Sequence, residues 1–102
     1  MSHSLDRESL ERVAPKLAEL TQQVLFADIW QRSTLTPRER SLITLATLTA
    51  LGRDRQLPWH LHFAVQNGLS QEELVELFTH LAFYAGWPAA VSALTVLEQE
   101  SI

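Results

Sequence analysis

The sequence predicts an all-α single domain over residues 1–102, folded as an antiparallel bundle of about five to six helices. Apolar residues recur at spacings of three and four along most of the chain, and no stretch alternates as a strand does. Glycine, proline and capping residues divide the chain into short helical segments. The connections between these segments are only a few residues long, which favours antiparallel neighbours.

The first predicted helix runs from about residue 5 to residue 26. Its apolar residues lie three or four positions apart, as on one face of a helix: Leu10, Val13, Ala14, Leu17, Leu20 and Val24. Pro15 lies inside this segment and predicts a kink, or a break with a short helix before it. A connector over 28–35 follows, and it contains Trp30.

The next helix has a clear start. Thr36 can cap it, Pro37 suits the first helical position, and Glu39 stands where a capping box needs an acidic residue. The stretch 41–51 is apolar nearly all round, apart from three threonines. Such a helix is normally central, so we expect it to be buried on every side. Gly52 is expected to end it.

Three further helices follow a charged turn at 53–55. Pro58 fits the first turn of a helix that reaches Asn67 and stops at Gly68. The run 70–73 is a second capping box, which predicts a helix over 71–85. Its core stripe is predicted to be Leu74, Leu77, Phe78, Leu81 and Ala85. The segment 86–88 closes that helix and opens the last one, over 88–100.

Composition excludes several functions. The chain has no cysteine, so disulfides, thiolate metal sites and thiol catalysis are ruled out together. A net charge of -4 argues against nucleic-acid binding, which needs a basic surface. No apolar run approaches the roughly 18 residues of a membrane helix, and residues 1–6 contain no apolar signal core. We therefore expect a cytoplasmic protein that contacts neither nucleic acid nor a membrane.

The apolar content is high for a chain of this length. Hydrophobic residues make up 46% of the sequence, and three of them are tryptophan. A single chain of about 100 residues buries only about two-thirds of its unfolded surface. Part of this apolar material is therefore expected to be buried against other copies of the chain.

His60 is the first candidate for chemistry. On a regular helix His60, Phe63, Ala64 and Asn67 share one face, whereas His62 lies about 200° round from His60. The two histidines therefore make a poor chelating pair, and we expect no metal site. One is expected to face inward and the other solvent. His60 is either a buried histidine that hydrogen-bonds to backbone or a general acid or base, since imidazole titrates near neutral pH.

Two other groups of residues suit a binding site. Glu76, His80 and Tyr84 are spaced by four, so they form either a proton-handling group or a surface ladder. Glu39 and Arg40 stand at a helix N-terminus, where an anion is favoured. Glu39 has an alternative role in the capping box. The sequence contains no phosphate-binding loop, dinucleotide-binding glycine pattern, serine nucleophile elbow or zinc-protease motif.

Five segments carry a resemblance to a known family. They are FADIW at 26–30, LTPRERSLITLA at 35–46, LPWHL at 57–61, NGLSQEEL at 67–74 and HLAFYAGWPA at 80–89. In this order and at these spacings the chain resembles the carboxymuconolactone decarboxylase family. The resemblance implies the all-α fold of the alkylhydroperoxidase-like proteins and a homo-oligomer, commonly a trimer-based hexamer.

The resemblance also separates two chemistries. The alkylhydroperoxidase branch uses two cysteines before a histidine and a glutamate 19 residues before it. In this chain those positions are Arg53, Gln56 and Ser41, and only the histidine, His60, remains. Thiol peroxidase activity is therefore not expected.

The decarboxylase branch, which lacks the cysteines, matches better. Its Arg-Ser-Leu motif corresponds to residues 40–42, and its histidine before an Asn-Gly turn corresponds to His60. One departure concerns substrate recognition, because that branch often has arginine where this chain has His62.

The resemblance implies a lyase that removes CO2, without a cofactor, from a small anionic lactone such as 4-carboxymuconolactone in aromatic catabolism. His60 is the predicted catalytic residue and proton donor, and Arg40 is predicted to anchor a substrate carboxylate. The other predicted substrate contacts are Glu39, Trp30, Phe63, His80, Tyr84 and Trp87. The alternative is a non-enzymatic binding or assembly module that keeps the oligomeric scaffold. If the chain is an enzyme, we expect a pocket lined by His60 and at least one arginine. If it is a module, we expect His60 to be packed, with no cavity beside it.

Overall fold

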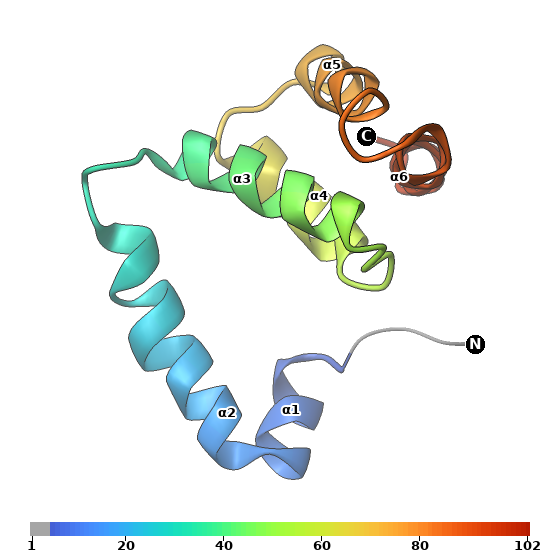
Figure 1. The fold of residues 1–102 in the computed structure, drawn as a ribbon. Helices are drawn as coiled ribbons and strands as arrows, with labels where there is room; N and C mark the ends of the chain where they lie inside the picture. Colours follow the sequence, from blue (N-terminus) through green and yellow to red (C-terminus); the bar gives the residue numbers. More distant parts are fainter. Residues whose placement is uncertain (1–4) are drawn as a thin grey trace. The chain divides into compact units, whose positions relative to one another are not determined.

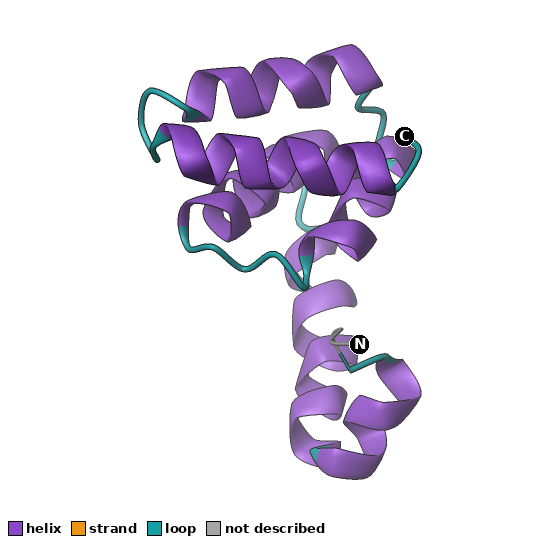
Figure 2. Ribbon diagram, turned by 90° about the vertical axis from the view of Figure 1, so that its right-hand side faces the viewer, coloured by secondary structure: helices purple, strands orange, loops and turns teal. Residues whose placement is uncertain are grey.

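The computed structural model describes residues 5–102, and over this range the chain forms helices, turns and loops with no strand (Figure 1, Figure 2). The all-α prediction is confirmed. Residues 1–4, which belong to the segment predicted to lack a signal core, lie outside the described residues. The chain divides into two compact units, one that ends at Pro37 and one that begins at Arg38. The prediction of a single domain stays a prediction.

The described part of the N-terminal unit contains two short α-helices, one π-helix and one 3₁₀ helix. They are α1 (Arg7–Val13), α2 (Pro15–Leu20), the π-helix η1 (Thr21–Phe26) and the 3₁₀ helix η2 (Ile29–Gln31). Ala14 has the non-helical dihedrals φ -142° and ψ 74°, and Pro15 takes the first position of α2. The predicted break at Pro15 is therefore confirmed, because proline fits only the first turn of a helix without losing a hydrogen bond.

The C-terminal unit is built from four helices around one core. They are α3 (Pro37–Ala50), α4 (Leu57–Gln66), α5 (Gln71–Leu81) and α6 (Trp87–Gln99). Helix α6 packs against both α4 and α5, and in Figure 1 the red α6 lies beside the tan and orange α5. The buried core residues come from all four helices and one loop: Leu45, Leu57, Leu61, Ala64, Leu69, Leu74, Phe78, Ala93 and Leu97.

The expectation that α3 is buried on every side is wrong for the single chain. Its buried residues are Ser41, Leu45 and Thr49, which lie on one side of the helix. Ile43 on another side is 52% exposed. The reason is that the helices of one small unit cover only one side of α3, so Leu42 and Leu48 are partly buried at its edges and Ile43 meets solvent.

Helix α5 begins as predicted and ends earlier. The Ser70 hydroxyl accepts a hydrogen bond from the Glu73 backbone N–H, and the Glu73 carboxylate accepts one from the Ser70 N–H, so the capping box is complete. The helix stops at Leu81 instead of residue 85. Tighter bonds replace the α-helical ladder there, such as Tyr84 N–H to Leu81 O at 3.1 Å. Four residues of the predicted core stripe are confirmed: Leu74 and Phe78 are fully buried, and Leu77 and Leu81 pack against the core. The fifth, Ala85, lies beyond the end of the helix.

Glycines with positive φ follow the helix ends that the sequence predicts. Gly68, after α4, has φ +100°, and Gly52, after α3, has φ +71°. Only glycine adopts such dihedrals without steric cost, so these two positions end the helices where the sequence places them. The histidines and Arg40 therefore lie on helices whose limits are set by local sequence.

Candidate functional site

His60 lies in the first turns of α4, on the flank of its core-facing side. Leu57 and Leu61, on either side of it, are fully buried and fix how the helix is rotated. The His60 ring is half-buried and meets the Trp59 ring edge-on, with centroids 4.9 Å apart. Burial lowers the pKa of His60 below its ordinary value of 6.5. The imidazole is therefore mainly neutral at neutral pH.

The His60 side chain makes no hydrogen bond and no ion pair with any residue from 5 to 102. The backbone hydrogen bond of a purely structural histidine is thus not found within this range. A half-buried imidazole in this state keeps both ring nitrogens for another partner, one as donor and one as acceptor. This is the property that a proton-transferring histidine needs.

His62 points to a different environment. Its ring is exposed, and Nε2 lies 3.0 Å from Oε1 of Glu100, which caps the end of α6. The prediction that one histidine faces inward and the other solvent is confirmed. The two imidazoles do not share a site, because the helix turns them away from each other.

Aromatic rings extend along α4 beside His60. Phe63, a predicted substrate contact, is half-buried and packs on Trp59 at a centroid distance of 4.8 Å. Trp59 is not among the residues that the sequence reasoning selected. Its spacing of four from Phe63 and its position next to His60 are the signals that would have found it. Together the two rings give the His60 site an apolar side.

The first turn of α3 holds the predicted anion anchor. Arg40 is half-buried and its Nε atom is buried, whereas Glu39 is exposed. Ser41, the next residue, is buried and accepts a hydrogen bond of 2.9 Å from Nδ2 of Asn67 at the end of α4. This bond connects the turn that carries Arg40 to the helix that carries His60. Sequence reasoning missed it because the two residues are 26 positions apart.

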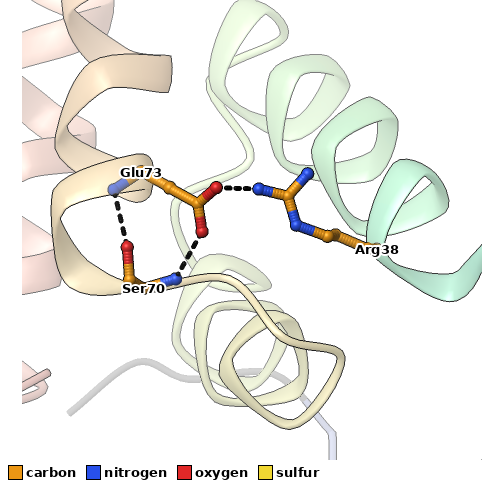
Figure 3. A network of polar contacts seen from close by, with 3 residues as sticks. All are labelled: Arg38, Ser70 and Glu73. Carbon is orange, nitrogen blue, oxygen red and sulfur yellow. Dashed lines mark hydrogen bonds and ion pairs between the residues drawn. The ribbon is translucent and has the colours of Figure 1, made fainter.

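A second polar contact holds the same turn from another side. The Arg38 guanidinium forms an ion pair with Glu73, whose other carboxylate oxygen accepts the Ser70 N–H (Figure 3). Glu73 therefore joins the start of α3 to the start of α5. Both side chains are about 40% exposed, so solvent screens the pair and its contribution to stability is small.

The aromatic residues after α5 form a separate group. His80 stacks on Tyr84 with centroids 4.9 Å apart, so the predicted i, i+4 contact is present, and Tyr84 is 79% exposed. Phe83 meets Trp87 edge-on at 5.8 Å. Phe83 and Trp87 help to line an apolar hollow of about 130 Å³ between α5 and α6. His80 and Tyr84 are not among its lining residues.

Trp30 lies in the N-terminal unit. It is 7% exposed and stacks on Phe26 at a centroid distance of 6.1 Å. Its predicted contact with a substrate stays a prediction, as do the substrate contacts predicted for Glu39, Arg40, Phe63, His80, Tyr84 and Trp87.

The structure places these predicted residues in separate small groups. His60 and Phe63 share α4, Arg40 lies in the first turn of α3, and His80 of α5 stacks on Tyr84 in the turn that follows. A second hollow is lined by residues 11–23 of the N-terminal unit, and neither hollow is lined by His60 or Arg40. Over residues 5–102 no cluster of three or more metal-ligating side chains occurs, and none of the helices has the length and apolar character needed to cross a membrane.

Comparison with known proteins identifies a family to which the sequence is similar. The model of the carboxymuconolactone decarboxylase family matches residues 15–99. A 4-carboxymuconolactone decarboxylase of Acinetobacter baylyi is 40% identical over 74 residues, which cover 72% of this chain and 55% of the relative. The nitrosuccinic acid decarboxylase npaB of Metarhizium robertsii is 31% identical over 81 residues, 79% of this chain and 57% of the relative. The chain thus spans little more than half the length of these curated relatives.

Proposed function

Because this chain belongs to the carboxymuconolactone decarboxylase family, we propose that it is a carboxy-lyase that releases CO2 from a small organic acid without a cofactor. The proposed substrate is 4-carboxymuconolactone, which the name of the 40% identical relative specifies. The observation that carries the proposal is His60, a half-buried imidazole with no hydrogen bond to residues 5–102.

The names of the two relatives share one chemical requirement. Loss of CO2 from carboxymuconolactone leaves an electron pair that the lactone carbonyl accepts through the ring double bond. Loss of CO2 from nitrosuccinic acid leaves one that the nitro group accepts. In both reactions negative charge develops on an oxygen away from the broken C–C bond. Placing hydrogen-bond donors at such an oxygen is a principal means of catalysis.

His60 supplies the proton in this proposal. The C–C bond to the carboxylate breaks, CO2 leaves, and the electron pair moves onto the lactone carbonyl. A ring carbon then takes a proton from the His60 imidazolium, which water restores. Burial keeps the ring neutral in the free chain, and a bound dianion favours its protonated form. Such a group contributes about 10²–10⁴-fold to a rate.

Arg40 and the aromatic rings complete the proposed site. The guanidinium of Arg40 binds a substrate carboxylate through two parallel hydrogen bonds, a geometry that lysine does not provide. Trp59 meets the imidazole edge-on and Phe63 packs on Trp59, so the two rings give the bound substrate an apolar side from which they would displace water. A dry environment strengthens both the ion pair and the proton donor.

We further propose that the chain acts as a homo-oligomer. Several large apolar side chains of the C-terminal unit are well exposed, among them Phe83 at 74% and Trp87 at 64%. Contacts between copies would remove this surface from water. Sedimentation of the wild-type chain and of Phe83→Lys tests this, and a wild-type chain that sediments as a monomer at micromolar concentration contradicts it.

The assay that tests the activity measures CO2 release from 4-carboxymuconolactone, with nitrosuccinic acid in parallel. We expect turnover by the wild-type chain and a loss of about 10²-fold or more in His60→Gln, because the proton donor is removed. His62→Gln is the matched control, since it removes an imidazole from the same helix on the side that contacts Glu100. Equal rates for His60→Gln and the wild type would refute the assignment of His60.

A non-enzymatic module is the competing function. It is favoured by one observation, namely that the apolar hollow between α5 and α6 is lined by residues other than His60 and Arg40. The same assay separates the two proposals. A module predicts no CO2 release from either acid by an oligomer that is fully folded, whereas the lyase predicts turnover that depends on His60.

A further inference from the structure

The Ser41–Asn67 hydrogen bond connects the two helices that hold the proposed reactive groups. Asn67 follows His60 by seven residues, so on α4 the two side chains point in directions within about 20° of each other and about 10 Å apart along the axis. Ser41 directly follows Arg40 in α3. The bond of 2.9 Å therefore fixes where the backbone of Arg40 lies relative to the side of α4 that carries His60.

This bond is well protected. The Ser41 side chain is buried and Asn67 is half-buried, so water competes weakly for either group. The neighbouring Arg40 has its Nε atom buried, and its backbone carbonyl accepts a bond of 2.8 Å from the Thr44 hydroxyl. The Arg40 stem is thus held at its base, and only a tightly held base gives a long side chain a defined direction.

The same turn is also held on its other side. Arg38 pairs with Glu73 of α5, so α3 is joined to α4 by Ser41 and to α5 by Arg38. The Arg38 pair is open to solvent, whereas the Ser41–Asn67 bond is partly buried, with Ser41 itself 2% exposed. The Ser41–Asn67 bond is therefore the stronger of the two constraints, because an exposed ion pair is screened by salt and flexible.

From these contacts we infer that Asn67 is a positioning residue, which acts through Ser41 to hold Arg40 in register with His60. The inference rests on the proposed function for its effect on catalysis and deepens it by assigning a role to Asn67. Asn67 itself does not touch the substrate. Removing its amide lets the first turn of α3 shift, and an error of about 1 Å in a binding group lowers a rate by up to about 10²-fold.

The kinetic test uses Asn67→Ala with 4-carboxymuconolactone as substrate. We expect KM to rise about tenfold with a smaller change in kcat, because the carboxylate anchor moves while His60 stays on α4. In an Arg40→Gln background the same substitution should have no further effect on KM, since the group through which it acts is gone. If the double variant instead shows a KM increase equal to the product of the increases in Asn67→Ala and Arg40→Gln, the inference is overturned.

A second measurement does not depend on turnover. The heteronuclear NOE of the Arg40 Nε–H reports the order of the guanidinium, and we expect it to fall in Asn67→Ala and in Ser41→Ala. Glu100→Ala is the matched control, because it removes another side-chain contact of α4, the one between His62 and the residue that ends α6. An Arg40 NOE that is unchanged in both variants overturns the inference. A wild-type chain that leaves the lactone intact refutes the proposed function, and the NOE then decides the positioning role alone.

Thermal unfolding followed by circular dichroism accompanies both measurements. Each variant is compared at a temperature at which it is fully folded, so that a loss of order at Arg40 reports a local change. Ser41→Ala removes the acceptor and Asn67→Ala the donor of one bond, so equal effects are expected from the two. An effect of Asn67→Ala on the Arg40 NOE without one of Ser41→Ala would overturn the route through Ser41.

Discussion

Ser41 and Thr49 lie two turns apart on the buried side of α3, and their hydroxyl groups differ in hydrogen bonding. Ser41 accepts a bond from Asn67, whereas the Thr49 Oγ1 has no partner within residues 5–102. Both side chains are 2% exposed. A buried hydroxyl without a partner has lost its hydrogen bonds to water and forms none within the protein, so it lowers the free energy of unfolding.

Thr49→Val is therefore expected to raise the free energy of unfolding by up to about 1–2 kcal/mol, because it replaces the hydroxyl with a methyl group of similar size. Ser41→Ala is expected to lower it by about 0.5–1.5 kcal/mol, since it leaves the Asn67 amide without its acceptor. Urea unfolding followed by circular dichroism measures both. A Thr49→Val variant less stable than the wild type contradicts the description of this hydroxyl.

The stability of the wild-type chain should fall in mild acid because of His60. Its pKa is lowered in the folded state by burial, so below the unfolded-state value of about 6.5 the unfolded chain binds the proton more readily. Stability due to this group is therefore complete above that pH and declines as the pH falls toward the folded-state pKa. We expect the difference in free energy of unfolding between the wild type and His60→Gln to be constant from pH 7 to 8. At pH 5 the wild type should have lost stability relative to the variant. A difference independent of pH would show that burial does not affect this imidazole.

Activity should also depend on the protonation of His60, but it should fall as the pH rises, whereas stability falls as the pH drops. If His60 donates a proton, its charged form is required, so kcat/KM declines as the pH rises through the free-enzyme pKa of His60, which lies below 6.5. The decline in kcat should occur at higher pH, because the bound dianion favours the imidazolium. Initial rates on 4-carboxymuconolactone from pH 5 to 8.5 check this. A kcat/KM that rises through this pH range would point to the neutral imidazole as the active form.

Phe78 on α5 is expected to be the most sensitive core position. Its ring is fully buried, and truncation of a buried phenylalanine to alanine costs about 3–5 kcal/mol. Val75 on the same helix is 39% exposed and serves as the control, with an expected change within about 0.5 kcal/mol for Val75→Ala. Urea unfolding of the two variants gives the comparison. Similar losses for both would mean that the Phe78 site collapses around the smaller side chain.

Features of the fold that depend on neighbouring residues could be predicted from the sequence. The capping box at Ser70 and Glu73, the break at Pro15 and the stop at Gly68 are each determined within four residues. The separation of His60 from His62 follows from the helical repeat alone. The prediction for α3 failed because a list of apolar residues does not show how many sides neighbouring helices cover.

Contacts between distant segments could not be predicted. The Ser41–Asn67 bond and the Arg38–Glu73 pair depend on how α3 meets α4 and α5, which no local pattern specifies. The π-helix over Thr21–Phe26 also has no sequence signal that distinguishes it from α-helix. Of the candidate site, helical spacing therefore predicted what lies on one helix, such as the opposite directions of His60 and His62, but not how Arg40 is held.

Glu73 accepts the Ser70 N–H with one carboxylate oxygen and meets the Arg38 guanidinium with the other. Mutational tolerance should therefore be uneven across this network. A change at Arg38 removes the ion pair alone, and a change at Ser70 weakens the helix start alone. Any change at Glu73 alters both at once. Among random variants selected for a folded chain, position 73 should accordingly accept fewer residue types than either of its two partners.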